Sequence, residues 1–138
     1  MNSFDTEAGV SLRIASRMRS VLDITRVIGV SPSKSCEKGE LISKKSRAPR
    51  YREESLWFVA SGLPLSAPIE EHLLKIAEFI DNHLPALQLL SAECDIGIYC
   101  CFTIYKGQGG FVLDNEILQR FLRLPIDLWI DLFSISSG

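Results

Sequence analysis

The chain has 138 residues, of which 46% are hydrophobic, and its formal net charge is −2. This size predicts a single domain over residues 1–138 with one hydrophobic core, since domains of ~100 to 150 residues are the commonest. The longest nearly uninterrupted apolar run, Ile96 to Tyr105, is far shorter than the ~18 residues that a membrane span needs. The sequence therefore excludes a transmembrane helix.

The first nine residues, MNSFDTEAG, include two acids and no basic residue. A secretory signal begins with basic residues and continues into an apolar block, so this start predicts a cytoplasmic protein. Residues 1–7 precede the first predicted element, and we expect them to be mobile.

The first predicted element is a half-buried strand over residues 10–15, where apolar and polar side chains alternate. Asp23 is expected to cap a short helix that ends at Gly29. Two further strands are expected over residues 39–43 and 56–61. In the second of these, alternation separates Leu56, Phe58 and Ala60 from Trp57, Val59 and Ser61.

The longest predicted helix begins after a Ser66 cap and ends before Pro85. Its apolar residues recur at helical spacing, which predicts one buried stripe. A second, short helical piece is expected over residues 86–90. The stripe consists of Ile69, Leu73, Ile76, Ala77 and Ile80.

The strand expected over residues 96–105 alternates so that its even-numbered residues face the core. The glycine-rich residues 106–110 are predicted to form a hairpin turn that leads into a strand over residues 111–113. Asp114 is expected to cap the next helix, and a last strand follows over residues 126–133. The helix residues expected to point inward are Ile117, Leu118, Phe121 and Leu122.

Strands that are apolar mostly on one side, joined by hairpin-like turns and mixed with helices, favour an α+β fold. We expect an antiparallel sheet with the helices packed on one face. The nearest named arrangement is the ferredoxin-like sandwich.

Short stretches spread over nearly the whole chain resemble a known family. They are SLRIAS, DITRVIGVSP, EKGE, LWFVAS, IEEHL, GGFVLDNEILQRF and PIDLWIDLF, in this order. The chain resembles the domain-of-unknown-function 4279 type, a bacterial family of small α+β domains. The stretches are packing and turn signatures, so the resemblance implies a compact α+β fold and no catalytic residue that could be carried over.

The predicted strand phases gather aromatic and polar residues on the sheet face turned away from the helices. Aromatic residues around an arginine are enriched in protein interfaces, and an exposed aromatic face is seldom left uncovered. We therefore expect a non-catalytic binding module that contacts a protein, either a second copy of the chain or an immunity-type partner. The candidate interface residues are Arg13, Trp57, Tyr99, Thr103, Tyr105, Asp127, Trp129 and Asp131, accompanied by Ser11 and Cys101.

An internal cover is an equally weighted alternative for this face. Loops or the N-terminal segment could fold over it and form a second small core. In that arrangement Arg13 would pair with Asp127 or Asp131.

A basic segment predicts a second kind of site. Residues 32–52 hold seven basic residues against two acids, and they are rich in serine, so we expect an exposed and mobile loop. The alternative function is a small-molecule binder or an enzyme acting on an anionic ligand, because arginine binds carboxylates and phosphates through paired hydrogen bonds. The candidate ligand residues are Lys44, Lys45, Arg47, Arg50 and Arg52.

Weak nucleic-acid binding is the third function considered. Asp127 and Asp131 flank Trp129 on the predicted face and would repel phosphates. The basic residues lie in a loop instead of along the strands. A nucleic acid is therefore the least favoured partner.

The cysteines and histidines do not predict a metal or cofactor site. Cys94 and Cys100 would lie ~20 Å apart on a strand, and Cys101 points away from Cys100. His72 and His83 would be separated by ~16 Å along a helix, too far to share a metal ion. We expect reduced cysteines, no cofactor and no catalytic residue.

Overall fold

The computed structural model of the chain describes residues 6–43 and 48–135. Its main sheet has five strands in the order β2-β5-β1-β6-β7, and β3 and β4 form a separate two-stranded sheet. The strands are β1 (Thr6–Ser16), β2 (Lys34–Cys36), β3 (Leu41–Ser43), β4 (Arg50–Tyr51), β5 (Ser55–Ala60), β6 (Asp95–Ile104) and β7 (Ile126–Ser134). The helices are α1 (Val21–Ile28), α2 (Ile69–Asn82), α3 (Leu84–Ser91) and α4 (Asn115–Phe121).

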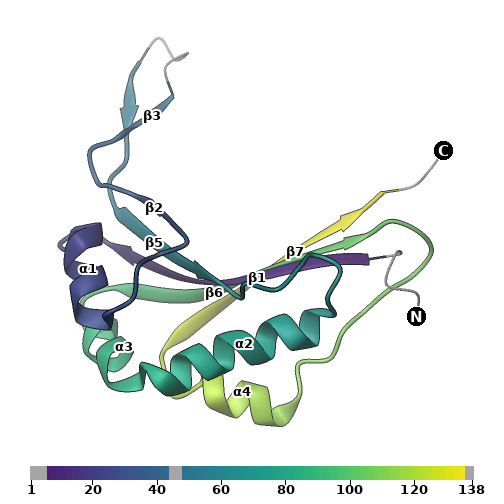
Figure 1. Cartoon of the computed structure of the whole chain (residues 1–138). Coiled ribbons are helices and arrows are strands. Elements are labelled where there is room, and N and C mark those ends of the chain that lie inside the picture. The colour runs from purple at the N-terminus through teal and green to yellow at the C-terminus, as the bar shows by residue number, and fades with distance from the viewer. Residues whose placement is uncertain (1–5, 44–47, 136–138) are drawn as a thin grey trace.

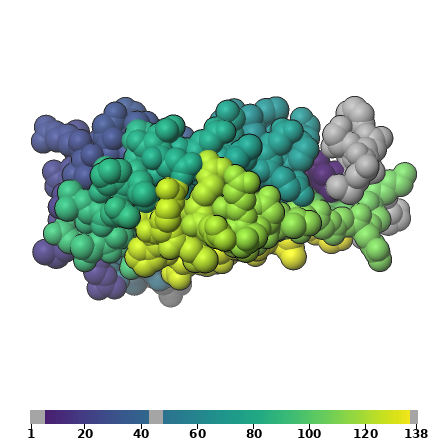
Figure 2. All heavy atoms as spheres, turned by 90° about the horizontal axis from the view of Figure 1, so that it is seen from below, coloured from purple at the N-terminus to yellow at the C-terminus, as the bar shows by residue number. Residues whose placement is uncertain are grey.

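The helices lie on one side of the main sheet (Figure 1). Seen from that side, the teal α2, the green α3 and the yellow-green α4 cover most of the sheet (Figure 2). On the other side no helix of the described residues covers the strands, and the β3–β4 hairpin rises at one end (Figure 1). The predicted α+β class with helices on one face is therefore confirmed.

The sheet is mixed, and this corrects the prediction of an antiparallel sheet. β1 pairs antiparallel with both β5 and β6, but β7 runs parallel to β6. Residues 105–114 form neither strand nor helix, so the predicted hairpin turn and the strand over residues 111–113 are wrong. The chain instead passes through α4, as a parallel connection requires a crossover. The ferredoxin-like topology is not confirmed.

The helix ends follow local capping chemistry. Ser20, and not the predicted Asp23, caps α1 by accepting a hydrogen bond from the Asp23 N–H. Gly29 ends α1 in the left-handed conformation, as expected for a glycine C-cap. Pro68 occupies the N-cap position of α2 in place of the predicted Ser66. Asp114 caps α4 as predicted, accepting from the Ile117 N–H.

The hydrophobic core lies between the helices and the sheet. The predicted stripe of α2 is buried in full, and the even-numbered residues of β6 from Ile96 to Phe102 are buried beside it. On α4, Ile117 and Phe121 are buried as predicted, whereas Leu122 is 69% exposed because the helix ends before it. At the far end of α2, Asp81 pairs with Arg120 and Arg123 and ties α4 to α2.

The predicted mobile segments are only partly described. Thr6 and Glu7 belong to β1 and pair with β6, and the segment of residues 32–52 contributes β2, β3 and β4. Lys44, Lys45 and Arg47 lie outside the described residues. The mobility of both segments stays a prediction. Among the described helices, none has the length and hydropathy to cross a membrane.

Candidate functional site

The open face is the side of the main sheet that faces away from the helices. In β1 the even-numbered residues Val10, Leu12 and Ile14 are buried against the helices, so Ser11 and Arg13 lie on the open face. Residues opposite each other in neighbouring strands share a face. The pairing of Ser11 with Tyr99, and of Tyr99 with Trp129, therefore extends the open face across β6 to β7.

The prediction that Trp57 lies on this face is wrong. Trp57 stands opposite Ile14 in the β1–β5 ladder, which turns it toward the helices. It is fully buried, and its Nε1 donates a hydrogen bond to Thr25 Oγ1 over 3.1 Å. Phe79 of α2 packs nearby, with ring centroids 6.4 Å apart. Trp57 is therefore a core residue that joins β5 to α1 and α2.

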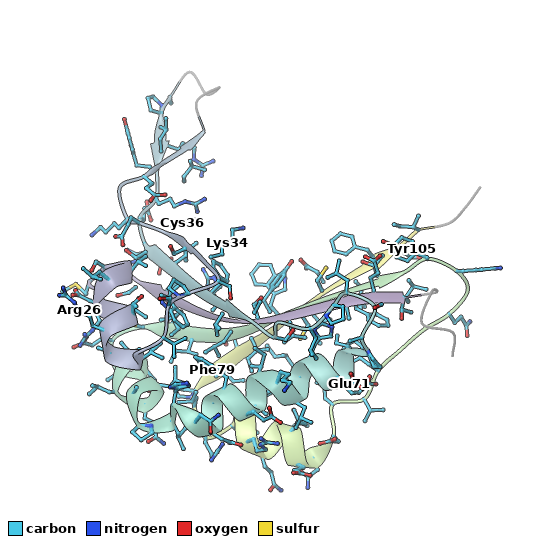
Figure 3. The ribbon with its side chains drawn as sticks, viewed as in Figure 1. Arg26, Lys34, Cys36, Glu71, Phe79 and Tyr105 are labelled. Atoms are coloured by element: carbon cyan, nitrogen blue, oxygen red, sulfur yellow. The ribbon has the colours of Figure 1, made fainter. Side chains whose placement is uncertain are left out.

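The opposite phase of β5 brings other residues to the open face. Phe58 stands opposite Arg13 on one side and Lys34 on the other, and the Lys34 ammonium lies 6.0 Å from the Phe58 ring centroid. Lys34 and Cys36 lie on the same side of the sheet as Tyr105, whereas Phe79 lies on the helix side (Figure 3). Because both faces of β5 carry large apolar residues, the sequence alternation alone held no signal for this phase.

An aromatic and acidic cluster occupies the β6–β7 half of the open face. Asp131 accepts a hydrogen bond from the Tyr99 hydroxyl and a second from Trp129 Nε1 over 2.8 Å. The two rings lie 6.2 Å apart between centroids. The bond to Asp131 raises the pKa of Tyr99 to about 12, and the two donors lower the pKa of the Asp131 carboxyl. These contacts hold the exposed Trp129 in a defined orientation.

Thr103 and Tyr105 extend the open face toward the end of β6. Thr103 stands between Glu7 of β1 and Phe133 of β7. A hydrogen bond to Glu7 raises the pKa of Tyr105. The predicted interface residues other than Trp57 are thus brought to one face.

Three hollows follow one another across the open face. The first has a volume of about 450 Å³ and is lined by Arg13, Leu56 and the β3–β4 hairpin. The second, about 140 Å³, lies between Arg13, Tyr99, Asp127 and Trp129. The third, about 420 Å³, lies beside Tyr99, where the loop after β5 passes Gly9. Arg13 lines the first and the second hollow, and Tyr99 lines the second and the third, so the three hollows adjoin one another; this row of hollows is called the groove below.

The first and the second hollow differ in charge. Arg13, Arg50 and Arg52 line the first hollow together with Glu53 and Glu54. Within the described chain, no carboxylate lies within 4.0 Å of any of the three guanidinium groups. The internal pairing of Arg13 with Asp127 or Asp131 is therefore not found among these residues. The second hollow is acidic on its β7 side.

A half-buried serine and a fully buried histidine line the third hollow. Ser61 Oγ and His72 Nδ1 are 2.5 Å apart, and no hydrogen-bond partner lies at His72 Nε2 among the described residues. Burial lowers the pKa of His72, so the ring is neutral in the folded protein. The contact ties the end of β5 to the first turn of α2. No local sequence pattern indicates this contact, since the two residues belong to different parts of the chain.

The cysteines occupy unrelated positions. All four are free: Cys94 and Cys100 are buried, and Cys36 and Cys101 are partly exposed. Burial raises the pKa of the Cys100 thiol to about 11, which keeps it protonated and unreactive. Cys94 and Cys100 pack in the hydrophobic core.

Comparison with known proteins gives a family and no activity. No curated protein and no solved structure matches the chain significantly. A sequence model described as "Domain of unknown function (DUF4279)" matches residues 6–134, nearly the whole chain and every helix and strand described above. The chain therefore belongs to the DUF4279 family.

Proposed function

We propose that this chain is a binding module that holds an extended segment of a protein partner in the groove of the open face. The observation that carries the proposal is the row of three adjoining hollows, which share Arg13 and Tyr99 as lining residues. A groove that crosses several strands suits a long, narrow occupant. The exposed aromatic residue beside it, Trp129, is of the kind that dominates protein interfaces.

The second hollow has the size and chemistry of a pocket for one side chain. Its volume of about 140 Å³ is below the ~300 to 1,000 Å³ of typical small-molecule sites. Asp127 and the ring of Trp129 line it, and Asp131 lies next to that ring. A lysine or arginine side chain of the partner would gain both ion pairing and a cation–π contact here.

In the first hollow three arginines stand against two glutamates, and this excess of positive charge favours an anionic group of the partner. Arg13, Arg50 and Arg52 can donate paired hydrogen bonds to a carboxylate of the partner. The third hollow exposes mainly apolar surface around Gly9 and Leu65. The proposed partner segment therefore carries an acidic residue, a basic residue and an apolar residue in the order of the three hollows.

The test is selection of random peptides on the immobilised full chain, followed by affinity measurement with labelled peptides. Selected peptides should be enriched in an acidic and a basic residue at a fixed separation. Asp127→Lys and Arg52→Glu should each weaken binding roughly tenfold or more, because each places a like charge against the peptide. Glu70→Lys, a charge reversal on the exposed start of α2, is the matched control and should leave affinity unchanged.

Two outcomes contradict the proposal. One is a selection without this charge pattern. The other is a set of peptides that bind the two groove variants as well as the original chain.

A small anionic ligand in the first hollow is the second candidate function. The volume of this hollow, about 450 Å³, lies within the usual range for small-molecule sites. The three arginines that line it lack carboxylate partners in the described chain. Phosphates and di- or tricarboxylates should raise the melting temperature of the chain but not of Arg52→Gln. A panel that leaves the melting temperature unchanged would remove this candidate.

A further inference from the structure

Among the described residues, no strand pairs with the outer edge of β7. β7 is the last strand of the main sheet, and it pairs with β6 without interruption from Ile126 to Ser134. Exposed strand edges are usually protected by lysine, proline or a bulge, since a free edge invites another strand. The sequence IDLWIDLFS has no lysine or proline, its ladder has no bulge, and its two charged residues, Asp127 and Asp131, both lie on the open face.

Both faces of β7 leave apolar groups exposed. On the helix side Ile130 is 37% and Leu132 is 66% exposed, because the helices leave the margin of the sheet partly uncovered. On the open face Trp129 and Phe133 are exposed as well. A partner strand would therefore bury apolar side chains on both sides of the sheet.

The free peptide groups of this edge belong to the aliphatic residues. The Ile135 N–H donates to the Ile104 carbonyl across the β6–β7 pair, over 2.9 Å. In an extended strand the peptide groups of successive residues alternate between the two sides. The odd-numbered residues of β7 therefore direct their peptide groups to β6, and Leu128, Ile130 and Leu132 direct theirs outward.

We propose that two copies of this chain pair through β7, antiparallel about a two-fold axis at Ile130, and so join their main sheets into one. This dimer contact is distinct from the proposed peptide groove, because it uses the edge of β7 instead of the open face. Ile130 is the central residue of β7, so the strands of both copies pair over their full length. The outward peptide groups of Ile130 would exchange hydrogen bonds with their own counterparts.

The charges of β7 select this register. With the axis at Ile130, Asp131 stands opposite Trp129 and Asp127 opposite Phe133, so no two acids meet. A shift of the axis to Trp129 would place Asp127 opposite Asp131, and a shift to Asp131 would place that residue opposite itself. Like charges that are directly opposite destabilise a strand pair. The axis at Ile130 also aligns Leu128 with Leu132 of the second copy, which completes an aliphatic row on the helix side.

The test uses a charge exchange that works only in this register. Leu128→Lys and Leu132→Glu are each expected to weaken dimerisation roughly tenfold or more, since each buries an unpaired charge between the strands. The double variant should dimerise again, because the new ammonium of one copy faces the new carboxylate of the other. Sedimentation velocity over a range of protein concentrations measures dimerisation of the original chain, the two single variants and the double variant. Circular dichroism checks that each of the four is folded.

Two controls separate this edge from other surfaces. Leu89→Lys changes an exposed leucine on α3 and should leave the dimer intact. Arg52→Glu changes the peptide groove away from β7 and should also leave the dimer intact, so failure of the groove proposal and failure of the dimer can be told apart. A chain that is monomeric at every concentration, single variants that dimerise normally, or a double variant that is not restored would each overturn the proposal.

Discussion

The two tryptophans of this chain both lie in strands of the main sheet but have opposite environments. Trp57 in β5 is fully buried, whereas Trp129 in β7 is 64% exposed. The Nε1 atom of each donates to a side-chain oxygen, Thr25 Oγ1 for Trp57 and Asp131 Oδ1 for Trp129. The difference lies in the opposing residue of the neighbouring strand, Ile14 in one case and Tyr99 in the other. Ladder register thus decides whether an aromatic side chain stabilises the fold or remains available for binding.

The strongest way to test this comparison is to truncate each tryptophan. Trp57→Ala should lower the free energy of unfolding by about 3 to 5 kcal/mol, since it leaves a large cavity between β5, α1 and α2. Trp129→Ala should lower it by no more than about 1 kcal/mol, because most of that side chain is already in water. Urea unfolding followed by circular dichroism measures both variants. Similar losses for the two would contradict the assignment of one tryptophan to the core and the other to the open face.

The buried faces of α2 and β6 could be predicted because most apolar residues of each element lie on one face. The apolar residues of α2 recur at helical spacing, and those of β6 occupy alternate positions, so in each case one face is clearly the core. In β5 both faces carry large apolar residues, and alternation could not choose between Trp57 and Phe58. The choice is made by pairing with β1, which is a long-range contact.

The parallel pairing of β7 was missed for a similar reason. Glycines in residues 106–110 are typical of a hairpin turn, but the chain continues through a loop into α4 before β7 begins. Local turn chemistry cannot show that the next strand returns from the other end of the sheet. The exposure of β7 on both faces was missed with it, because the regular alternation of IDLWIDLF suggested one fully covered side.

The groove was predicted in part. Arg13, Tyr99 and Trp129 could be placed on one face from strand period alone. Their arrangement around three hollows depends on the β3–β4 hairpin and on the loop that passes Gly9, and neither position follows from a local pattern.

A second prediction concerns the buried side on which Trp57 lies. His72 is buried and its pKa is lowered by that burial, whereas in the unfolded chain its pKa is the usual 6.5. As the pH falls below about 6.5, the unfolded chain binds a proton that the folded protein does not, so stability is lost progressively. The contribution is fully present above that pH. Thermal unfolding between about pH 7.5 and 5.5 should show a falling melting temperature, well above the usual range for carboxylates.

Two variants isolate the contribution of His72. His72→Gln removes the titrating group and should flatten the pH dependence in this range. His83→Gln changes the partly exposed histidine that packs on Phe79 and should retain it. If all three proteins lose stability in parallel, the neutral buried histidine is not the cause.

The smallest expected effect belongs to the open face, where Trp129 is held through Asp131. The hydrogen bond from Tyr99 to Asp131 raises the pKa of Tyr99 to about 12, because ionising the hydroxyl would remove the donor and place a second negative charge beside the carboxylate. Asp131→Asn should bring the pKa of Tyr99 back toward about 10, as followed by NMR of its ring carbons. Glu7→Gln is the matched control, since Glu7 acts on Tyr105 and should leave Tyr99 unchanged. If the pKa of Tyr99 does not respond to Asp131→Asn, Tyr99 does not hold Asp131 in place beside Trp129. The exposed tryptophan would then differ from Trp57 in order as well as in burial.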